Sequence, residues 1–406
     1  MKILFFVSSM HAGGAERVAA TLSGGWVRQG REVILAPTYT RKGKLFYTLD
    51  PQVRIEWVAD RLGWLARTPL APLVKLVALR RLLREERPDV VVSFLTNVNV
   101  MVLMASWGLH VPVIVCERTN PAVSTSATPR LQRLRRWLYP RAAMVTVQAE
   151  ASMAAMMKQV PNMRRLAVVP NPLPPDLPDP VTSLAHLSAV TPASADAVAP
   201  VTAAAQYPAP QSESAPIARR RLVAMGRFVP SKRYAGLIRI FERLAPRFPE
   251  WDLFIWGDGP LRKELEAGVA AAGLVERIQL PGRTATPWKE LQASDLFVLT
   301  SEVEGFPNAL IEAMALGLPC VSVDCPSGPK EITRSGQDAL LVPLNDEAAL
   351  EQALAGLMAD PAARARLAEQ GAKSVRQRYG LEQVLAHWDG LFREVGVHAA
   401  PNSSGV

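Results

Sequence analysis

The sequence contains little cysteine and little histidine, with 3 and 5 residues among 406. Cys116, Cys320 and Cys325 are odd in number and show no metal-ligand spacing, which excludes a disulfide framework and a zinc cluster as organising features. We therefore expect a protein of the reducing cytosol.

Long uninterrupted apolar runs are also missing. Residues 90–116 form the most apolar region, but Asn97, Asn99, His110 and Pro112 interrupt it. This argues against a membrane-spanning helix, and we expect a strand, a helix and a second strand there. The N-terminal stretch MKILFFVSSMHAGG has too short an apolar core for a signal peptide and predicts a first buried strand.

Aromatic residues make up only 6% of the chain, whereas its net charge is +9 and its pI about 9.7. The charge indicates an anionic partner, either a phosphate-rich ligand or a membrane surface. A nucleic-acid-binding protein is an alternative that rests on charge alone. It is not favoured, because the basic residues are not interleaved with aromatic residues in a stacking platform.

Length and composition predict two globular domains of the α/β class. Short apolar runs alternate with helical stretches over residues 1–172 and again over residues 219–380, which is typical of parallel, doubly wound sheets. Between them, residues 173–218 are rich in Pro, Ala and Ser, and we expect a linker or disordered insertion. Residues 381–397 predict an amphipathic helix, and residues 398–406 a disordered tail.

Residues 295–324, DLFVLTSEVEGFPNALIEAMALGLPCVSVD, predict a strand, a loop, a helix and a second strand. We expect the helix to run from Asn308 to Leu316, with Asn308 as its N-cap and Gly317 as its C′ residue, because Pro319 forbids further helix. In a parallel sheet, the loop between strand and helix lies at the carboxyl edge, where such sheets bind ligands.

This loop and helix carry two carboxylates, Glu304 and Glu312. The free N–H groups near Ala309, Leu310 and Ile311 suit a phosphate, since a helix N-terminus is effectively positive. One carboxylate beside that end suits a ribose diol, and the other suits sugar hydroxyls. The pattern indicates a sugar joined to a nucleotide through phosphates. An ordinary αβ unit with two solvated glutamates is the alternative.

Two further loops follow predicted strands. Gly13 and Gly14 allow the backbone to approach a ligand closely at a helix N-terminus, although a simple tight turn explains them equally well. Arg227 and Lys232 follow a strand beside Gly226 and precede a helix, so both charges are able to face a phosphate at the sheet edge. Surface charges without a ligand remain the alternative for this pair.

The string SEVEGFPNALIEAMALGLPCVS resembles, almost position by position, the paired-glutamate signature of retaining glycosyltransferases of family 4. The resemblance implies the GT-B fold, in which two Rossmann-like domains face each other across a cleft and a last helix crosses back to the first domain. It implies catalytic roles for Glu304, Arg227 and Lys232, with no cofactor and no metal. It also implies that a nucleotide-diphosphate sugar contacts Gly13, Gly14, Gly226, Arg227, Lys232, Glu304, Gly305, Phe306, Asn308, Ala309, Leu310 and Glu312.

The acceptor is expected on the first domain. Candidate residues at the ends of its predicted strands are His11, Glu117, Arg118 and Asn120. Members of the family often carry a histidine near the position of Arg118, but this chain has CERTN there. A catalytic histidine is therefore not carried over to this position.

Two basic stretches in the first domain mix arginine with apolar residues at helical spacing. They cover residues 61–89 and the segment PRLQRLRRWLYPRA, which includes Trp137 and Tyr139. Such helices either lie in an anionic membrane interface or pack on the sheet with their arginines in water. Family members that glycosylate lipid-linked acceptors attach to the inner leaflet in this way, so peripheral membrane contact is included in the expected location.

We expect an enzyme that moves a hexose or N-acetylhexosamine from a nucleotide-diphosphate sugar, with UDP favoured, to a glycan or lipid-linked acceptor. Four alternatives remain open at this stage. They are a sugar-phosphate or sucrose-type synthase of the same fold, a nucleotide-sugar epimerase, a catalytically inactive binding subunit of a polysaccharide assembly complex, and the nucleic-acid-binding protein considered above.

Overall fold

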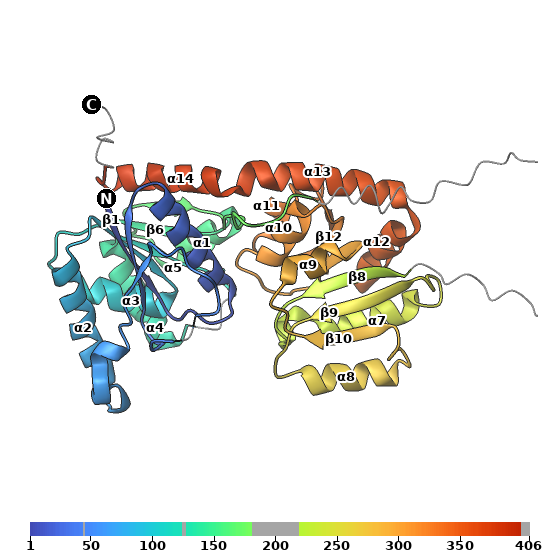
Figure 1. Cartoon of the computed structure of the whole chain (residues 1–406), viewed down its shortest axis with the longest axis horizontal. Helices are drawn as coiled ribbons and strands as arrows, with labels where there is room; N and C mark the ends of the chain where they lie inside the picture. Colours follow the sequence, from blue (N-terminus) through green and yellow to red (C-terminus); the bar gives the residue numbers. More distant parts are fainter. Residues whose placement is uncertain (44, 124–126, 181–218, 399–406) are drawn as a thin grey trace, which may run out of the picture.

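The computed structural model describes residues 1–43, 45–123, 127–180 and 219–398. Two α/β domains lie side by side, and a pair of C-terminal helices runs along both of them (Figure 1). Each domain is built on one parallel sheet, as the alternation of apolar runs predicts.

The sheet of the first domain has seven strands in the order β3-β2-β1-β4-β5-β6-β7. Its central strands are almost entirely buried, because helices cover both faces of the sheet and neither face is exposed to water. The strands are β1 (Lys2–Val7), β2 (Glu32–Pro37), β3 (Arg54–Ile55), β4 (Val90–Phe94), β5 (Val113–Cys116), β6 (Met144–Val147) and β7 (Leu166–Val168).

The helices of this domain alternate with the strands. Apolar side chains from both faces of the sheet form two core clusters, one of which includes α1 and the other α2 and α3. The helices are η1 (Asp60–Arg67), α1 (Gly14–Arg28), α2 (Ala71–Glu86), α3 (Thr96–Ala105), α4 (Pro129–Leu138), η2 (Tyr139–Arg141) and α5 (Glu150–Gln159).

The second domain has six strands in the order β10-β9-β8-β11-β12-β13. The strands are β8 (Arg220–Met225), β9 (Trp251–Trp256), β10 (Ile278–Gly282), β11 (Leu296–Leu299), β12 (Cys320–Asp324) and β13 (Leu340–Pro343). The helices are η3 (Pro230–Lys232), α7 (Tyr234–Leu244), α8 (Arg262–Ala271), α9 (Pro287–Gln292), α10 (Asn308–Ala315), α11 (Pro329–Ile332), α12 (Glu347–Ala359) and α13 (Pro361–Tyr379).

Each sheet reverses its strand order at one central strand. In the first domain β1 lies between β2 and β4, and in the second domain β8 lies between β9 and β11. Crevices form at the carboxyl ends of such strands, because the connections on either side run in opposite directions. The loops that carry Gly13 and Gly14 after β1, and Gly226 and Arg227 after β8, lie at these two switch points.

The last helix, α14 (Leu381–Glu394), packs against α1 of the first domain. The Trp388 ring contacts Trp26 edge to face at 5.4 Å between centroids, and Arg31 pairs with Asp389. Gly25 allows this approach, because a Cβ there would lie 2.8 Å from a methyl group of Leu385. The C-terminal helices thus connect the second domain back to the first.

The segment between the domains is only partly described. Residues 173–180 of the expected linker pack against the second domain, with Leu173 and Leu177 buried and the Leu173 N–H donating to the Tyr379 carbonyl at 2.7 Å. The remaining part of that linker, residues 181–218, and residues 399–406 of the expected tail lie outside the described residues.

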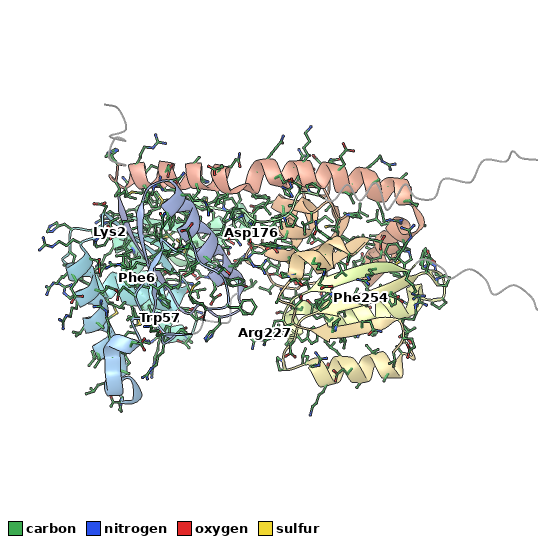
Figure 2. The ribbon with its side chains drawn as sticks, in the orientation of Figure 1. Lys2, Phe6, Trp57, Asp176, Arg227 and Phe254 are labelled. Carbon is green, nitrogen blue, oxygen red and sulfur yellow. The ribbon has the colours of Figure 1, made fainter. Side chains whose placement is uncertain are left out.

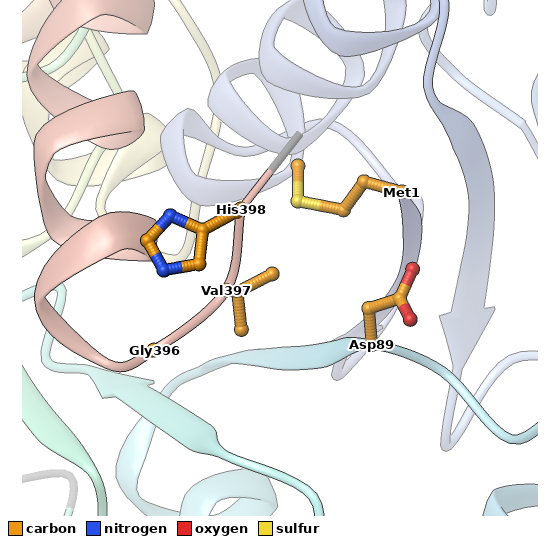
Figure 3. Close-up of a pocket in the computed structure, with 5 residues that line it drawn as sticks. All are labelled: Met1, Asp89, Gly396, Val397 and His398. Atoms are coloured by element: carbon orange, nitrogen blue, oxygen red, sulfur yellow. The ribbon is translucent and has the colours of Figure 1, made fainter. Parts of the chain in front are cut away.

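A small pocket of about 320 Å³ lies where the two ends of the described chain meet (Figure 3). Met1, Asp89 and the segment from Gly396 to His398 line it. It is remote from both switch points, and its lining combines one carboxylate and one imidazole with apolar groups.

Candidate functional site

A cavity of about 1310 Å³ lies between the two domains. Its first-domain wall includes His11, Arg17 and Tyr47, and its second-domain wall includes Gly226, Arg227 and Trp288. Figure 2 labels Arg227 and Asp176, which also lines the cavity, at the junction of the domains. This volume exceeds that of a typical small-molecule pocket, so the cavity has room for a larger ligand.

Arg227 is exposed on the loop that follows β8. Its guanidinium forms no hydrogen bond or ion pair with any residue in the described part of the chain, although it lines the cavity. A guanidinium offers five donors in a planar fork that matches a phosphate group. All five N–H donors of the Arg227 guanidinium are therefore available to a ligand in the cavity.

Lys232 and Glu304 form a close pair in the second domain. The Lys232 Nζ donates to the Glu304 Oε1 at 2.5 Å, and the two side chains are 20% and 14% exposed. The backbone is fixed as well, because the Thr300 hydroxyl donates to the Lys232 carbonyl at 2.7 Å. Burial and the Glu304 charge together raise the pKa of Tyr234 beside this pair. Neither Lys232 nor Glu304 is among the residues that line the cavity.

Glu312 is buried one turn into α10 and is held from two directions. Arg17, on α1 of the first domain, donates to both carboxylate oxygens, and the Trp288 indole donates to Oε2 at 2.9 Å. Burial by itself lowers the pKa of Arg17, but the charges of Glu312 and Tyr47 raise it above its ordinary value. The guanidinium therefore stays protonated, and the ion pair links the two domains.

The start of α10 differs from the sequence-based expectation. Pro307 is the N-cap residue, Asn308 is the first helical residue, and no side-chain cap hydrogen bond forms. The prediction of Asn308 as N-cap is wrong because its side chain reaches the first domain, where Asn171 donates to its Oδ1 at 2.5 Å and its Nδ2 donates to the Gly14 carbonyl at 3.3 Å. The Ala309 N–H has no partner in the described part of the chain.

The glycine loop of the first domain contacts this helix start directly. A Cβ on Gly14 would lie 3.2 Å from the Asn308 amide nitrogen, and the Gly13 N–H donates to the Tyr47 hydroxyl at 3.2 Å. Gly305 is even closer to the first domain, because a Cβ there would lie 2.3 Å from the Arg118 carbonyl oxygen. These glycines allow the two backbones to approach, as expected of glycine at such contacts.

Phe306 and Leu310 are buried and support the loop from beneath. The Phe306 ring packs edge to face on Tyr379 at 5.3 Å between centroids, and Leu310 is fully buried in the apolar cluster of the second domain. Both residues therefore act through packing in this structure. Gly226 is similarly crowded, since a Cβ there would lie 2.7 Å from the Tyr234 hydroxyl.

The four acceptor-side candidates separate into two groups. His11 is exposed and lines the cavity. Asn120 is buried at the domain contact and donates to the Pro326 carbonyl at 3.4 Å. Arg118 is also buried there, where it lies over the Phe94 ring at 4.2 Å and donates to Asn171. Burial lowers the pKa of Arg118 to about 10.

Glu117 lies apart from the cavity, in the interior of the first domain. Its carboxylate accepts hydrogen bonds from the Thr96 hydroxyl at 2.8 and 3.0 Å and from the Tyr139 hydroxyl, and Arg135 lies 3.7 Å away. Burial, followed by the Glu117 charge, raises the pKa of Tyr139. These internal partners use the acceptor sites of the carboxylate.

Sequence reasoning overlooked Arg17, Trp288 and Asn171. Arg17 stands three residues after the second glycine of the predicted phosphate loop, and this spacing on a helix was an available signal. Asn171 follows a predicted strand in VVPNP, which is a position at a sheet edge. No local pattern connects Trp288 with Glu312, because their contact depends on how α9 packs against α10.

The sequence matches two family models over most of its length. Residues 12–177 match the family described as Glycosyltransferase Family 4, and residues 210–374 match that described as Glycosyl transferases group 1. Together with the two facing parallel-sheet domains, these matches define the class of the protein. The chain belongs to the family 4 glycosyltransferases and has the GT-B architecture, as its sequence signature indicates.

One relative is similar over almost the whole chain and another over less than half of it. It is 27% identical over 97% of its length to an N-acetyl-D-galactosaminyltransferase of Campylobacter jejuni that acts on a GalNAc-containing undecaprenol diphosphate, of which it covers 99%. It is 35% identical over 43% of its length to an exopolysaccharide phosphotransferase of Streptomyces coelicolor, of which it covers only 19%.

Two solved structures share the fold at 18% identity. A sucrose-phosphate synthase of Thermosynechococcus elongatus aligns with 97% of this chain and 99% of its own at a TM-score of 0.77. The Anabaena protein HepE, solved with UDP and glucose, aligns with 97% of this chain and 99% of its own at a TM-score of 0.72.

The described residues contain no cluster of three or more His, Cys, Asp or Glu side chains suited to a metal ion. Among the same residues, no helix combines the length and the apolar character that crossing a bilayer requires.

Proposed function

We propose that the protein transfers a hexose or N-acetylhexosamine, with retention, from a nucleotide-diphosphate sugar to a glycan or lipid-linked acceptor. UDP is the favoured nucleotide. The observation that supports this most strongly is the set of charged residues on neighbouring elements of the second domain. Arg227 lines the cavity after β8, Lys232 pairs with Glu304 on the loop after β11, and Glu312 lies in α10. The activity of the Campylobacter relative, an N-acetyl-D-galactosaminyltransferase, and the UDP bound to the Anabaena protein support the same chemistry.

In this proposal the donor lies in the second domain. Arg227 and Lys232 bind the diphosphate, assisted by the free Ala309 N–H at the start of α10. Glu312 accepts hydrogen bonds from the ribose, and Glu304 orients the transferred sugar. The carboxylate of Glu304 also holds Lys232 in place at 2.5 Å.

The reaction breaks the bond between the sugar C1 and the diphosphate oxygen and forms a bond between C1 and the acceptor oxygen on the same face. The acceptor proton passes to the departing diphosphate, so no separate base is required. Negative charge grows on the diphosphate as the bond breaks, and Arg227 and Lys232 stabilise it. Preorganised charge of this kind is commonly the largest single contribution to catalysis. The two cations supply the positive charge, and the proposal includes no cofactor.

A thermal-shift screen against UDP, GDP, ADP and their common sugars tests the donor assignment. A ligand that binds only the folded state raises its apparent stability. We expect one nucleotide series to raise the Tm, with UDP favoured, and the shift to be lost in Glu312→Gln, which keeps the shape but not the charge. If no nucleotide raises the Tm, the donor site is wrongly assigned and the inactive binding subunit becomes the better description.

A patch on the first domain supports contact with an anionic membrane surface. Arg130, Arg133, Leu134, Trp137 and Arg141 recur at helical spacing along α4 and just beyond it, and all five are exposed. Trp137 is 53% exposed. Trp107 lies beside it at 5.4 Å between ring centroids, and the Arg141 guanidinium lies 4.5 Å from both rings.

We include in the proposal that this patch binds the inner leaflet peripherally, so that a lipid-linked acceptor is presented to the cleft. Aromatic rings and arginines together suit the headgroup region. The protein should sediment with anionic phosphatidylglycerol vesicles at low salt and stay in the supernatant at high salt. Trp107→Ala/Trp137→Ala should weaken retention, whereas Val275→Ala, at a 57% exposed position in the second domain, should not. Equal retention by both variants would refute this surface as the contact.

A further inference from the structure

The carboxylate of Glu312 already has partners, although the proposed function assigns it to the donor ribose. Arg17 donates to both oxygens and Trp288 donates to Oε2 at 2.9 Å, which makes three hydrogen bonds. A carboxylate offers about four acceptor sites. A ribose diol brings two donors, so it needs at least one site that Arg17 or Trp288 now occupies, and Arg17 occupies two of these three.

The low exposure of Glu312 also indicates that a ligand has to displace Arg17 in order to reach this carboxylate. Its side chain is only 3% exposed, and Arg17 covers it from the first domain. Because Arg17 lies on α1 and Glu312 on α10, the ion pair joins the domains across the contact where Gly14 meets Asn308. A nucleotide that reaches Glu312 therefore has to open this cross-domain pair.

The displaced guanidinium requires a new anion. Arg17 stays charged and its side chain is only 22% exposed, so the loss of its carboxylate partner is unfavourable unless another anion replaces it. The same side chain lines the cavity together with Arg227. A diphosphate offers oxygens that a guanidinium binds with two parallel hydrogen bonds. A nucleoside without phosphates opens the pair but supplies no anion in exchange.

We propose that Arg17 is a donor-specificity residue that makes binding depend on the diphosphate: it pairs with Glu312 in the donor-free protein and turns to the diphosphate when the ribose takes Glu312. This inference rests on the proposed function. It adds a specificity residue in the first domain to a donor site otherwise built from the second domain. It also predicts that donor binding changes the link between the domains.

Calorimetric titration of uridine and UDP into the full chain tests the proposal, with guanosine and GDP, and adenosine and ADP, measured alongside. The readout is the ratio of the nucleoside Kd to the diphosphate Kd. In Arg17→Met this ratio should fall by about tenfold or more, because the nucleoside no longer has to break the pair and the diphosphate loses a charged partner. Arg17→Lys should recover part of the ratio.

Arg31→Met is the matched control. This substitution also removes an arginine that pairs with a distant part of the chain, because Arg31 pairs with Asp389 in the C-terminal helix. Arg31, however, lies outside the cavity. The substitution should lower the Tm and leave the ratio unchanged. A parallel loss of nucleoside and diphosphate affinity in Arg17→Met, with the ratio kept, would overturn this inference alone. If none of the nucleotides binds the unmodified protein, the proposed function fails and this inference fails with it.

Discussion

Among single residues, Lys232 and Glu304 give the most specific prediction about catalysis. Their 2.5 Å contact fixes a cation and a carboxylate beside the β8 switch point. Each side chain is mostly buried, so the pair is screened less by water than the exposed arginine pairs of α7. An ammonium group held in this way provides positive charge for a departing diphosphate without reorganising during the reaction.

The first prediction concerns Lys232→Ala. Loss of one preorganised donor typically lowers kcat by about 10²- to 10³-fold, and we expect a decrease of that size in sugar transfer. Initial-rate kinetics with the identified donor measure it. Arg239→Ala is the control, because Arg239 forms an exposed 2.8 Å pair with Glu347 on the surface of the same domain. A Lys232→Ala enzyme with wild-type kcat would remove Lys232 from the mechanism.

The second prediction concerns the buried thiols. Burial raises the pKa of Cys116 and Cys325 to about 12, and all three cysteines are free and buried. The folded protein should resist a thiol reagent at pH 8 and react at three sites once unfolded. Because unfolded thiols ionise near pH 9 and the folded thiols of Cys116 and Cys325 only near pH 12, the free energy of unfolding should decrease as the pH rises through this interval. Rapid labelling of the native protein would contradict the burial of these side chains.

At the scale of elements, the contact of the β11–α10 loop with the first domain is close enough to exclude any side chain at Gly305. A Cβ there would lie 2.3 Å from the Arg118 carbonyl and 2.6 Å from the Gln148 side chain. Asn171 adds to the same contact by donating to the Phe306 carbonyl at 3.3 Å. The loop that carries Glu304 is thus shaped by the first domain as well as by its own sheet.

The third prediction is that Gly305→Ala destabilises the protein by about 1–3 kcal/mol, the usual cost of forcing an extra group into a packed contact. Denaturant unfolding monitored by circular dichroism measures it. Gly268→Ala is the control in helix α8, where a Cβ meets nothing within 4 Å. That change should instead stabilise by about 0.5–1 kcal/mol, since alanine is the better residue in a helix interior. Equal stabilities of the two variants would contradict the described loop contact.

Most of the elements follow from local sequence. The apolar runs in both halves predict the parallel strands, and Gly317, with a positive φ of 82°, ends α10 as expected. The two-residue strand β3 was not predicted, because an edge strand of that length has no periodicity to detect. The wrong N-cap assignment of Asn308 and the overlooked Arg17 share one cause. Both side chains bind partners in the other domain, and local patterns contain no information on such contacts.

At the scale of the whole molecule, two kinds of contact join the domains. Helix α14 packs its aromatic face on α1. Around the cleft the contacts are polar, and they include the Ser152 and Ser327 hydroxyls at 2.8 Å and the Ala151 N–H donating to Glu331 at 3.1 Å. Polar contacts of this kind between domains are weaker than an apolar core, so relative domain motion is expected. The cavity with Arg227 lies between the domains and would change with that motion.

The most direct test of the central claim is the affinity for UDP of the unmodified protein and of Arg227→Ala. Arg227 is exposed and has no partner among the described residues, so its removal should leave the Tm of the free protein unchanged. Loss of a charged hydrogen bond should weaken UDP binding by about 10- to 100-fold. Calorimetric titration provides both values. Binding to the unmodified protein with a loss of this size in the variant agrees with a donor diphosphate at the β8 switch point, whereas equal binding by the two proteins, or none by either, would contradict it.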